Sequence, residues 1–402
     1  MAGLMTDEVK ALKAEAEVQR QEQTTRARSY KSPYQRWKES QGLETIYGFS
    51  VPNVYTAELT PWEARGGSAV FVNLDGSAGF NDSYIYELAP KESSVPIRHT
   101  YDELVFILRG RGAVTVWNDE KKKQTIEWAK GSYFAIPPNA WHQWHNLSGD
   151  EPARYFAMTA APRVIDTFKD LDFVFNNDYR FRNIFDDEES YFQQTERTRN
   201  WETNYIADVW ALAPKRRATA EEVEQKARAA AELGEGWKSV GRFLKSGEEA
   251  QGFGATMLRG TVHAGISFGS QPGTHAPPHR HGPGIHVTVI GGHGYTLLQS
   301  PAMDQIVRVD WGPGTVFVPP EGWWHAHYNT GPEPWDWLKV GWGSEKPKAG
   351  GGHYDYSRTP QEGGDQMAFD DMDPAVHRQF EEECARVGVK CLMLHHPHCS
   401  YR

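Results

Sequence analysis

The stretch GTVFVPPEGWWHAHYN, residues 314–329, joins two runs of apolar and aromatic residues through Pro and Gly. Runs of this length bounded by turn-forming residues are typical of short β-strands. The same plan recurs as GSYFAIPPNAWHQWHN at residues 131–146, so that 183 positions separate His142 from His325.

A second pair of segments repeats with the same offset. RHTYDELVFILRGRGAVTVW, residues 98–117, corresponds to RHGPGIHVTVIGGHGYTLLQ, residues 280–299, and 182 positions separate His99 from His281. Two separate motifs that keep one offset to within a residue indicate a tandem repeat of one β domain.

The sequence around the repeats predicts the domain organisation. Strand-like runs such as SYIYELAP and ARYFAMTAAP, at regular spacing, predict a sandwich or small barrel in each half. Helices are expected at the polar residues 6–29, after an N-cap at Thr219, and after Asp373 with Pro374 in the first turn. The predicted units are a helical arm at 1–47, a first β domain at 48–162, a helical or irregular linker at 163–250, a second β domain at 251–346 and a Gly-rich loop with a C-terminal helix at 347–402.

Composition excludes several function classes. The net charge of −10 argues against nucleic acid or an anionic membrane surface as the partner. No apolar run reaches the roughly 18 residues that a membrane span needs. The first 30 residues show no secretory signal, and three cysteines near the C-terminus form no disulfide framework, so we expect a cytoplasmic protein.

These motifs resemble those of the cupin superfamily, and the resemblance covers both β domains. The family's second motif is complete in the C-terminal half, at Gly314, Pro320, Gly322, His325 and Asn329. The N-terminal half has Asn139 in place of the turn glycine, and Asn tolerates the left-handed backbone that such a turn requires. The resemblance implies a bicupin, an all-β fold of two tandem double-stranded β-helix (jelly-roll) barrels with flanking helices.

The first motif predicts the primary metal site. Alternate residues of a strand share a face, so His279 and His281 can point together into the barrel, where His325 arrives from another strand. Counting back from Gly292 puts Ile285 where the family has its glutamate, and His286 one position out of register. Because a slip of one residue reverses the face, we expect His286 to point away from the metal.

The N-terminal half predicts a secondary metal site at His99, Glu103 and His142, with Ile97 at the position of the missing histidine. Two histidines and a carboxylate can form a facial triad. The alternative is a decayed site that serves only as scaffold.

The histidine triplet and the bicupin build resemble the gentisate and salicylate 1,2-dioxygenases. That resemblance implies Fe(II), an aromatic hydroxy acid or similar bidentate anion as substrate, and dioxygen. His327 is a candidate catalytic acid or base, and Trp323 and Trp324 are candidates for stacking on a flat substrate. The alternatives are a Mn, Ni or Zn isomerase, decarboxylase or lyase, and a non-catalytic small-molecule-binding bicupin.

Two terminal features remain. The polar N-terminal helix and the C-terminal helix have no evident core of their own to cover, and related bicupins are dimers or tetramers, so we expect a homodimer or homotetramer. The C-terminal tail has the composition of a soft metal site, with His395, His396, His398 and Cys399. The alternative is a tail that is poorly ordered or packs on the domain surface without a metal, which is more common for a terminal segment with no strands around it.

Overall fold

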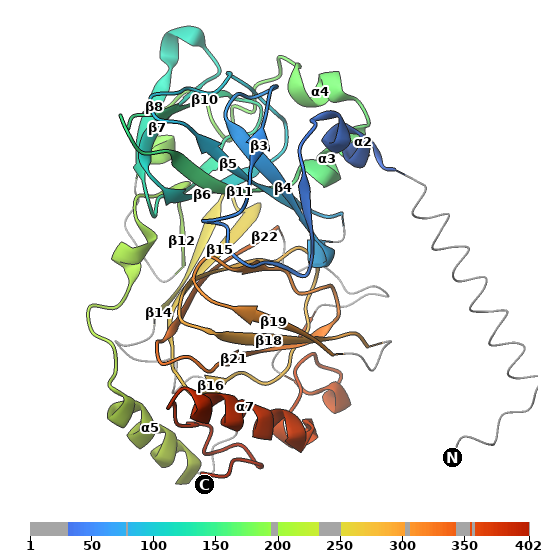
Figure 1. Ribbon diagram of the computed structural model, residues 1–402. Helices are drawn as coiled ribbons and strands as arrows, with labels where there is room; N and C mark the ends of the chain where they lie inside the picture. Colours follow the sequence, from blue (N-terminus) through green and yellow to red (C-terminus); the bar gives the residue numbers. More distant parts are fainter. Residues whose placement is uncertain are drawn as a thin grey trace, which may run out of the picture.

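The computed structural model describes residues 31–77, 79–193, 200–232, 251–301, 306–342, 354–355 and 358–401. It is dominated by β-strands, which form two barrels stacked one on the other (Figure 1). The helix predicted over residues 6–29 and most of the Gly-rich loop lie outside the described residues.

The first barrel closes a large sheet over a small one. The large sheet has the order β1(Thr45–Gly48), β4(Ser68–Leu74), β5(Asp82–Leu88), β11(Ala153–Thr159), β6(Glu103–Arg109), β9(Tyr133–Ile136) and β13(Tyr205–Ile206), with β3(Thr60–Pro61) beside β4. The small sheet has the order β10(Trp141–Asn146), β7(Arg111–Trp117) and β8(Gln124–Ala129).

The second barrel repeats this plan. Its large sheet has the order β12(Asn200–Glu202), β14(Gln251–Met257), β15(Val262–Ser270), β22(Trp335–Gly341), β17(His286–Gly291), β20(Val316–Phe317) and β2(Ser50–Val51). Its small sheet has the order β16(Thr274–His275), β21(Trp324–Asn329), β18(Gly294–Gln299) and β19(Ile306–Trp311). Two edge strands cross between the halves, because β2 joins the second barrel and β13 the first.

Equivalent glycines show that the repeat is structural. A Cβ at Gly112 would lie 2.1 Å from the carbonyl oxygen of His145 and 2.4 Å from the ring of Trp128. A Cβ at Gly294 would lie 2.0 Å from the carbonyl oxygen of Tyr328 and 2.6 Å from the ring of Trp311. Each glycine lets a tryptophan of the small sheet pack against the neighbouring strand's backbone.

We therefore expect Gly294→Ala to destabilise the second barrel by about 1–3 kcal/mol, because a backbone carbonyl cannot yield as a flexible side chain can. Urea unfolding measures the loss. Gly149→Ala is the control, since its Cβ would meet only Lys91 Cε at 3.6 Å. Equal midpoints for the two variants would contradict the packing described here.

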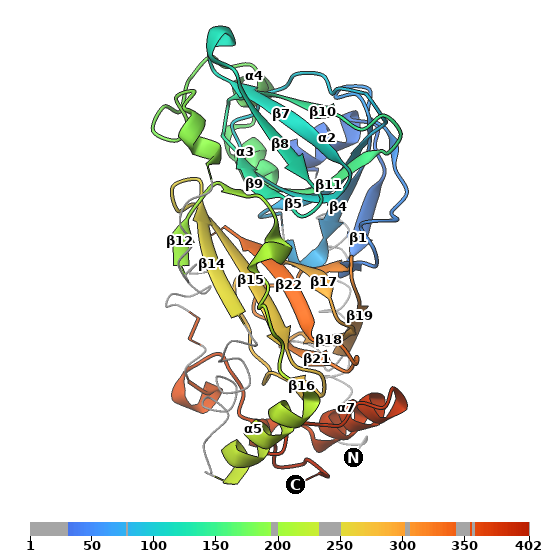
Figure 2. The ribbon, with the colours of Figure 1, turned by 90° about the vertical axis from the view of Figure 1, so that its left-hand side faces the viewer.

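The large sheets of the two barrels pack back to back. Val262, Ala264, Ile266 and Phe268 of β15 alternate along the strand and join one buried cluster with residues of β5 and β11. The ring of His286 lies 6.3 Å from that of Phe156 across this interface. Figure 2 shows β15, β17 and β22 directly below β5 and β11. This packing assigns the other face of β15 and β22 to the interior of the second barrel.

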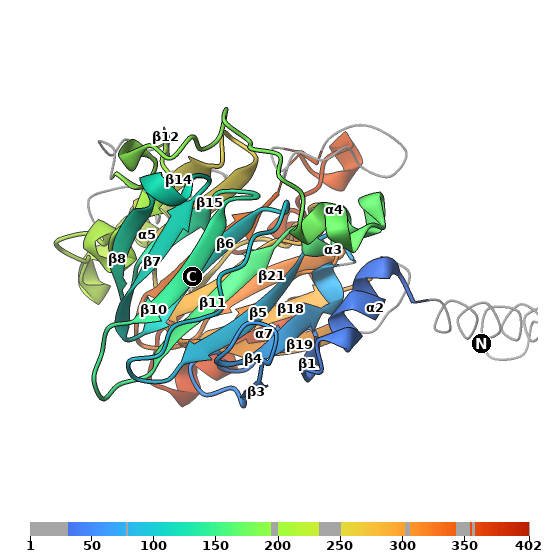
Figure 3. The ribbon, with the colours of Figure 1, turned by 90° about the horizontal axis from the view of Figure 1, so that it is seen from above.

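Helices lie at one side of the first barrel and at the far end of the second. α2(Pro33–Ser40) begins with a capping box at Ser32 and, with α3(Ala161–Phe168) and α4(Leu171–Phe175), lies at one edge of the first barrel (Figure 3). α5(Ala220–Glu232) and α7(Pro374–Arg386) lie at the far end of the second barrel. The predicted Asp373 cap is confirmed, since its carboxylate accepts the Ala375 amide at 2.8 Å. The short 3₁₀ turns are Asp75–Ser77, Glu120–Lys122, Glu189–Phe192, Val209–Leu212, Pro360–Glu362 and Phe369–Asp371.

Among the described residues, no helix combines the length and the apolar character that crossing a membrane requires.

Candidate metal centres

The second barrel gathers imidazoles around β21. His325 exchanges two backbone hydrogen bonds with His279, at 2.9 and 2.8 Å. The ring centroid of His325 lies 4.3 Å from that of His279 and 4.5 Å from that of His281. The three histidines predicted as the primary site are therefore neighbours in space.

Backbone carbonyls fix how these rings are protonated. The Nδ1 atoms of His325 and His281 donate to the carbonyl oxygens of Trp323 and Gly282, at 3.0 and 2.9 Å. A carbonyl only accepts, so the Nε2 of a neutral ring carries the lone pair that a metal binds. Within the described part of the chain, Nε2 of buried His325 has no hydrogen-bond partner. This orphaned acceptor fits a divalent ion.

The segment that carries the first two histidines is not the strand that the sequence predicts. Pro277 and Pro278 precede His279, and Pro283 follows His281 by two positions, so the missing proline amides interrupt any continuous ladder of backbone hydrogen bonds. Only His279 forms a bridge to β21. In the first barrel, Ile97 forms the same isolated bridge to His142.

With this irregular backbone, the three histidines whose nitrogens lie nearest to one another are not the three that the sequence predicts as metal ligands. His279, His325 and His327 each offer a ligand atom within 4.8 Å of the others, a grouping that takes in His327 and leaves out His281. His327 Nδ1 lies 2.8 Å from the hydroxyl of Thr296, which also accepts the indole N–H of Trp311. The predicted catalytic His327 thus faces the same space as the metal histidines.

The strand register supports the count that placed Ile285. In the first barrel Val105 pairs with Phe134, and in the second Val287 pairs with Phe317. Moving two residues back from each pair aligns Glu103 with Ile285. His286 then corresponds to Leu104 and points toward Phe156 of the other barrel, away from the site.

Lys339 is a member of this site that the sequence reading missed. It lies on β22 between Leu338 and Val340, which pack into the interface between the barrels, so it points into the second barrel. Its side chain covers Gly265, where a Cβ would lie 2.8 Å from Lys339 Cγ. Burial lowers the pKa of Lys339. Burial, with the Lys339 charge as a smaller contribution, lowers the pKa of His281 to about 4.

The two residues predicted to stack on a substrate, Trp323 and Trp324, lie in different surroundings. Trp323 lines the apolar cluster in the second barrel, 5.6 Å from the ring of Phe49. Trp324 immediately precedes His325 on β21, and its ring lies 4.6 Å from the Arg280 guanidinium, which is held by Asp365. Trp324 alternates with His325 along β21, so its ring points away from the histidine cluster, and Trp323 is the better placed of the two predicted stacking residues.

The first barrel brings its three predicted ligands together. His99, Glu103 and His142 offer ligand atoms within 4.8 Å of one another, and His99 Nε2 lies 3.0 Å from Glu103 Oε2. The Nδ1 atoms of His99 and His142 donate to the carbonyl oxygens of Tyr101 and Ala140. Nε2 of His142 has no hydrogen-bond partner among the described residues. This donor set also fits a divalent ion.

A buried arginine network surrounds this first site. Arg65 donates to the hydroxyls of Tyr84 and Tyr101 at 3.1 and 3.0 Å, and Tyr84 donates to Glu103 at 2.8 Å. Burial alone would raise the pKa of Glu103, but His99, Arg65 and His142 lower it to about 2. Burial lowers the pKa of His142 to about 3. Glu103 and His142 are 0 % exposed, so a substrate cannot reach them without a rearrangement of the barrel.

One family model and several solved structures resemble parts of this chain. Residues 84–159 match the family model described as Cupin domain. No curated protein matches the chain in sequence. A deletion mutant of the oxalate decarboxylase of Bacillus subtilis is 14 % identical, with 74 % of this chain and 78 % of that chain covered and a TM-score of 0.46.

The formate complex of the oxalate decarboxylase of Lactobacillus farciminis is also 14 % identical, with 74 % of this chain and 86 % of that chain covered and a TM-score of 0.42. These comparisons do not confirm the predicted resemblance to gentisate and salicylate dioxygenases. The matched segment contains most of the strands of the first barrel, and the second barrel repeats its strand order and register, so the chain folds as a bicupin.

Proposed function

We propose that this protein is a metal-dependent enzyme whose reaction takes place in the second barrel and moves a proton on a small carboxylate anion, as in a decarboxylase, lyase or isomerase. The observation that carries the proposal is the inward-pointing Lys339, which shares the barrel with the histidine cluster and His327. Among the described residues, Lys339 makes no ion pair that would neutralise its charge.

Access favours the second barrel over the first. His279 and His327 are half-buried, whereas the three ligands of the first barrel are fully enclosed. A substrate can therefore approach the second cluster, while the first suits an ion with a structural role. An apolar wall of Trp323, Trp335 and Phe317 lines the second barrel and would exclude water around a small or flat substrate.

The donors of the second site are all neutral, so a bound divalent ion would keep its full charge and act as a Lewis acid toward a carboxylate or hydroxyl oxygen. Lys339 would add a second positive charge and orient the anion. His327, held at Nδ1 by Thr296, can give or take a proton at Nε2. In a decarboxylation, the bond to the carboxylate breaks, CO₂ leaves and the carbon takes a proton from His327 or Lys339.

A dioxygenase is the second candidate. The observation that favours it is the donor set of imidazoles with no carboxylate, since Ile285 replaces Glu103 in register. Facial coordination by three side chains leaves open positions of the kind that iron oxygenases use.

The two functions separate in one assay. Protein loaded with Fe(II), Mn(II), Ni(II) or Zn(II) is supplied with a panel of hydroxy-, oxo- and dicarboxylates and hydroxybenzoates. Oxygen uptake is recorded together with CO₂ release and proton exchange from solvent. We expect turnover that persists without oxygen, and uptake of one dioxygen per substrate would establish the dioxygenase instead.

Lys339→Met should lower kcat/KM for the carboxylate substrate roughly 10- to 100-fold, because a charge-assisted contact contributes about 1.5–3 kcal/mol. Metal content should stay unchanged, since the ammonium group is not a ligand. Lys122→Met, on the exposed surface of the first barrel, is the control. Full activity in Lys339→Met would show that Lys339 does not contact the substrate.

A further inference from the structure

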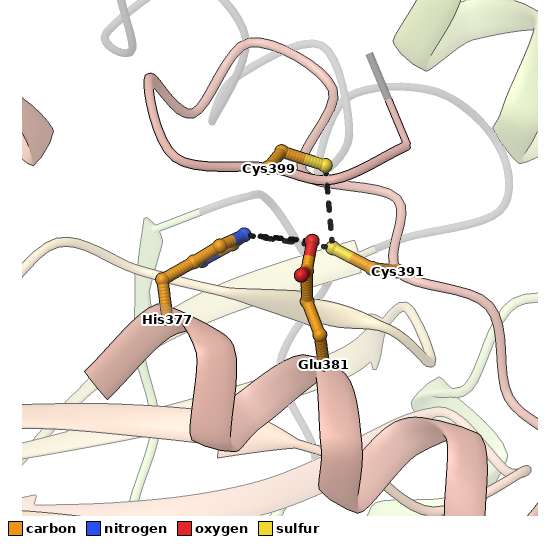
Figure 4. Close-up of side chains that lie close together, drawn as sticks. All are labelled: His377, Glu381, Cys391 and Cys399. Carbon is orange, nitrogen blue, oxygen red and sulfur yellow. Dashed lines mark hydrogen bonds and ion pairs between the residues drawn. The ribbon is translucent and has the colours of Figure 1, made fainter. Parts of the chain in front are cut away.

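The C-terminal tail, residues 387–401, folds back along α7 and brings four metal-binding side chains together. His377 and Glu381 lie one turn apart on α7, and Cys391 and Cys399 come from the tail (Figure 4). All four side chains are buried, and each offers a ligand atom within 4.8 Å of the others. We propose that these residues form a structural tetrahedral Zn²⁺ site that fastens the tail to the second barrel.

The distances have the size of a coordination tetrahedron. Zinc bonds of about 2.3 Å to sulfur and about 2.0 Å to nitrogen or oxygen give edges of roughly 3.8 Å between two sulfurs and roughly 3.3 Å between nitrogen and oxygen. The Sγ atoms of Cys391 and Cys399 lie 3.8 Å apart, His377 Nε2 lies 3.4 Å from Glu381 Oε1, and the same Nε2 lies 3.9 Å from Cys391 Sγ. The sulfurs are therefore placed for a shared ion, far beyond the roughly 2.05 Å of a disulfide.

A relay of hydrogen bonds presents the lone pair of His377 to this space. His275 Nδ1 lies 3.2 Å from the carbonyl oxygen of Ala276, which can only accept, so Nδ1 donates. In the neutral ring, His275 Nε2 must then accept from His377 Nδ1, also at 3.2 Å. His377 Nε2 is left as an acceptor that faces the carboxylate of Glu381, another acceptor. A cation between them resolves this repulsion.

The carboxylate is also held in place. Ser400 donates its backbone N–H and its hydroxyl to the two oxygens of Glu381, each at 2.8 Å. Because Ser400 follows Cys399 directly, the same contact positions the second thiol.

A three-histidine set formed by His275, His377 and His396 is the competing arrangement in this region. Its geometry is less suitable. The rings of His377 and His396 are stacked, 3.7 Å apart and inclined by 8°, so their nitrogens point side by side and do not converge. The Nδ1 of His377 is occupied by His275. The thiol-containing set is the one whose donors converge.

The site would seal the outer face of the small sheet. The tail contacts the residue before β16, where the Leu392 amide donates to the carbonyl oxygen of Gly273 at 2.8 Å. The approach is so close that a Cβ on Gly273 would lie 2.0 Å from the oxygen of Lys390. Beneath it, Tyr328 of β21 is buried against Phe380 of α7. This apolar cluster lies behind the strand that carries His325 and His327, so fastening the tail supports the catalytic strand from outside.

Cobalt substitution tests the proposal on the full-length protein. After chelation under reducing conditions, Co(II) should produce the intense visible bands of a tetrahedral thiolate complex and a sulfur-to-metal charge-transfer band in the near ultraviolet. The barrel sites contain imidazole and carboxylate only, so they cannot produce that band. Cys391→Ser and Cys399→Ser should each lose the charge-transfer band and about one bound metal per chain. Cys384 is a buried residue of α7 outside the cluster, so Cys384→Ser should keep the band and the metal.

A second pair of variants guards against simple misfolding. Glu381→Gln should weaken and shift the cobalt bands with little change in circular dichroism, whereas Glu382→Gln, its exposed neighbour, should match the parent protein. Metal-loaded parent protein without a sulfur charge-transfer band would overturn the proposal. So would a Cys391–Cys399 disulfide recovered from metal-free protein, or a band that survives Cys391→Ser. Activity plays no part in these readouts, so they stand apart from the proposed function.

Discussion

His325→Gln is expected to lose the metal of the second barrel and at least about 100-fold in turnover. His325 is central to the cluster, since its ring lies within 4.5 Å of the ring centroids of both His279 and His281. Removing a group that only supports a ligand costs 10- to 100-fold, so removing the ligand itself should cost at least as much. Metal analysis and steady-state kinetics on the same preparation measure both losses. Glutamine keeps most of the buried volume.

The matched variant is His142→Gln, at the equivalent position of the first barrel. It should lose one metal and retain most of its turnover, because the first site is closed to substrate. A reversed result, with turnover lost in His142→Gln and kept in His325→Gln, would move the reaction to the first barrel.

Arg65→Met is expected to destabilise the metal-free protein by about 3–5 kcal/mol. Arg65 is buried and balances Glu103 through the hydroxyl of Tyr84, and breaking such a network leaves a buried carboxylate without compensation. Urea unfolding after chelation measures the effect. Saturating divalent metal should recover much of the loss, since an ion at His99, Glu103 and His142 supplies positive charge at the same place.

Arg111→Met is the control, because Arg111 is exposed on β7 of the same barrel and should change the free energy of unfolding by less than about 0.5 kcal/mol. A metal-free Arg65→Met protein as stable as this control would show that Glu103 is not carried as a buried charge. A loss that metal cannot reduce would count against an ion in the first barrel.

The repeat is the part of the architecture that the sequence predicts best. Matched offsets between motifs require matched strands, and the pairing of Val105 with Phe134 and of Val287 with Phe317 bears this out. Asn139 was expected to take the place of a turn glycine, and it has a φ of 58°, against 71° for Gly322. A local pattern of this kind succeeds because the backbone conformation of a turn depends mainly on the residues within it.

Two features of the candidate sites escaped the sequence. Lys339 alternates with Leu338 and Val340 on a strand that has large apolar residues on both faces, so the pattern alone could not say which face lined the barrel. The packing of the two large sheets decides it. The tail cluster combines two residues of α7 with two residues of the loop that follows it. These residues meet only because the chain folds back along the helix, and no local sequence pattern indicates that fold.

The positions of two edge strands could not be predicted from the sequence for a related reason. β2 lies between β1 and β3 of the first barrel in the chain but pairs with β20 of the second, and β13 of the predicted linker pairs with β9 of the first. Strands of two residues carry no periodicity of their own, so only the unpaired edge that receives them determines where they lie.

The most direct test of the central claim is an anomalous-scattering map from crystals of metal-replete protein, collected at the absorption edge of the bound metal. We predict a peak inside the second barrel, on the Nε2 side of His325 and within bonding distance of His279 and His281, with His327 outside the set of ligands. A second barrel without a peak, with its imidazoles hydrogen-bonded to one another or to protein groups, would contradict the account.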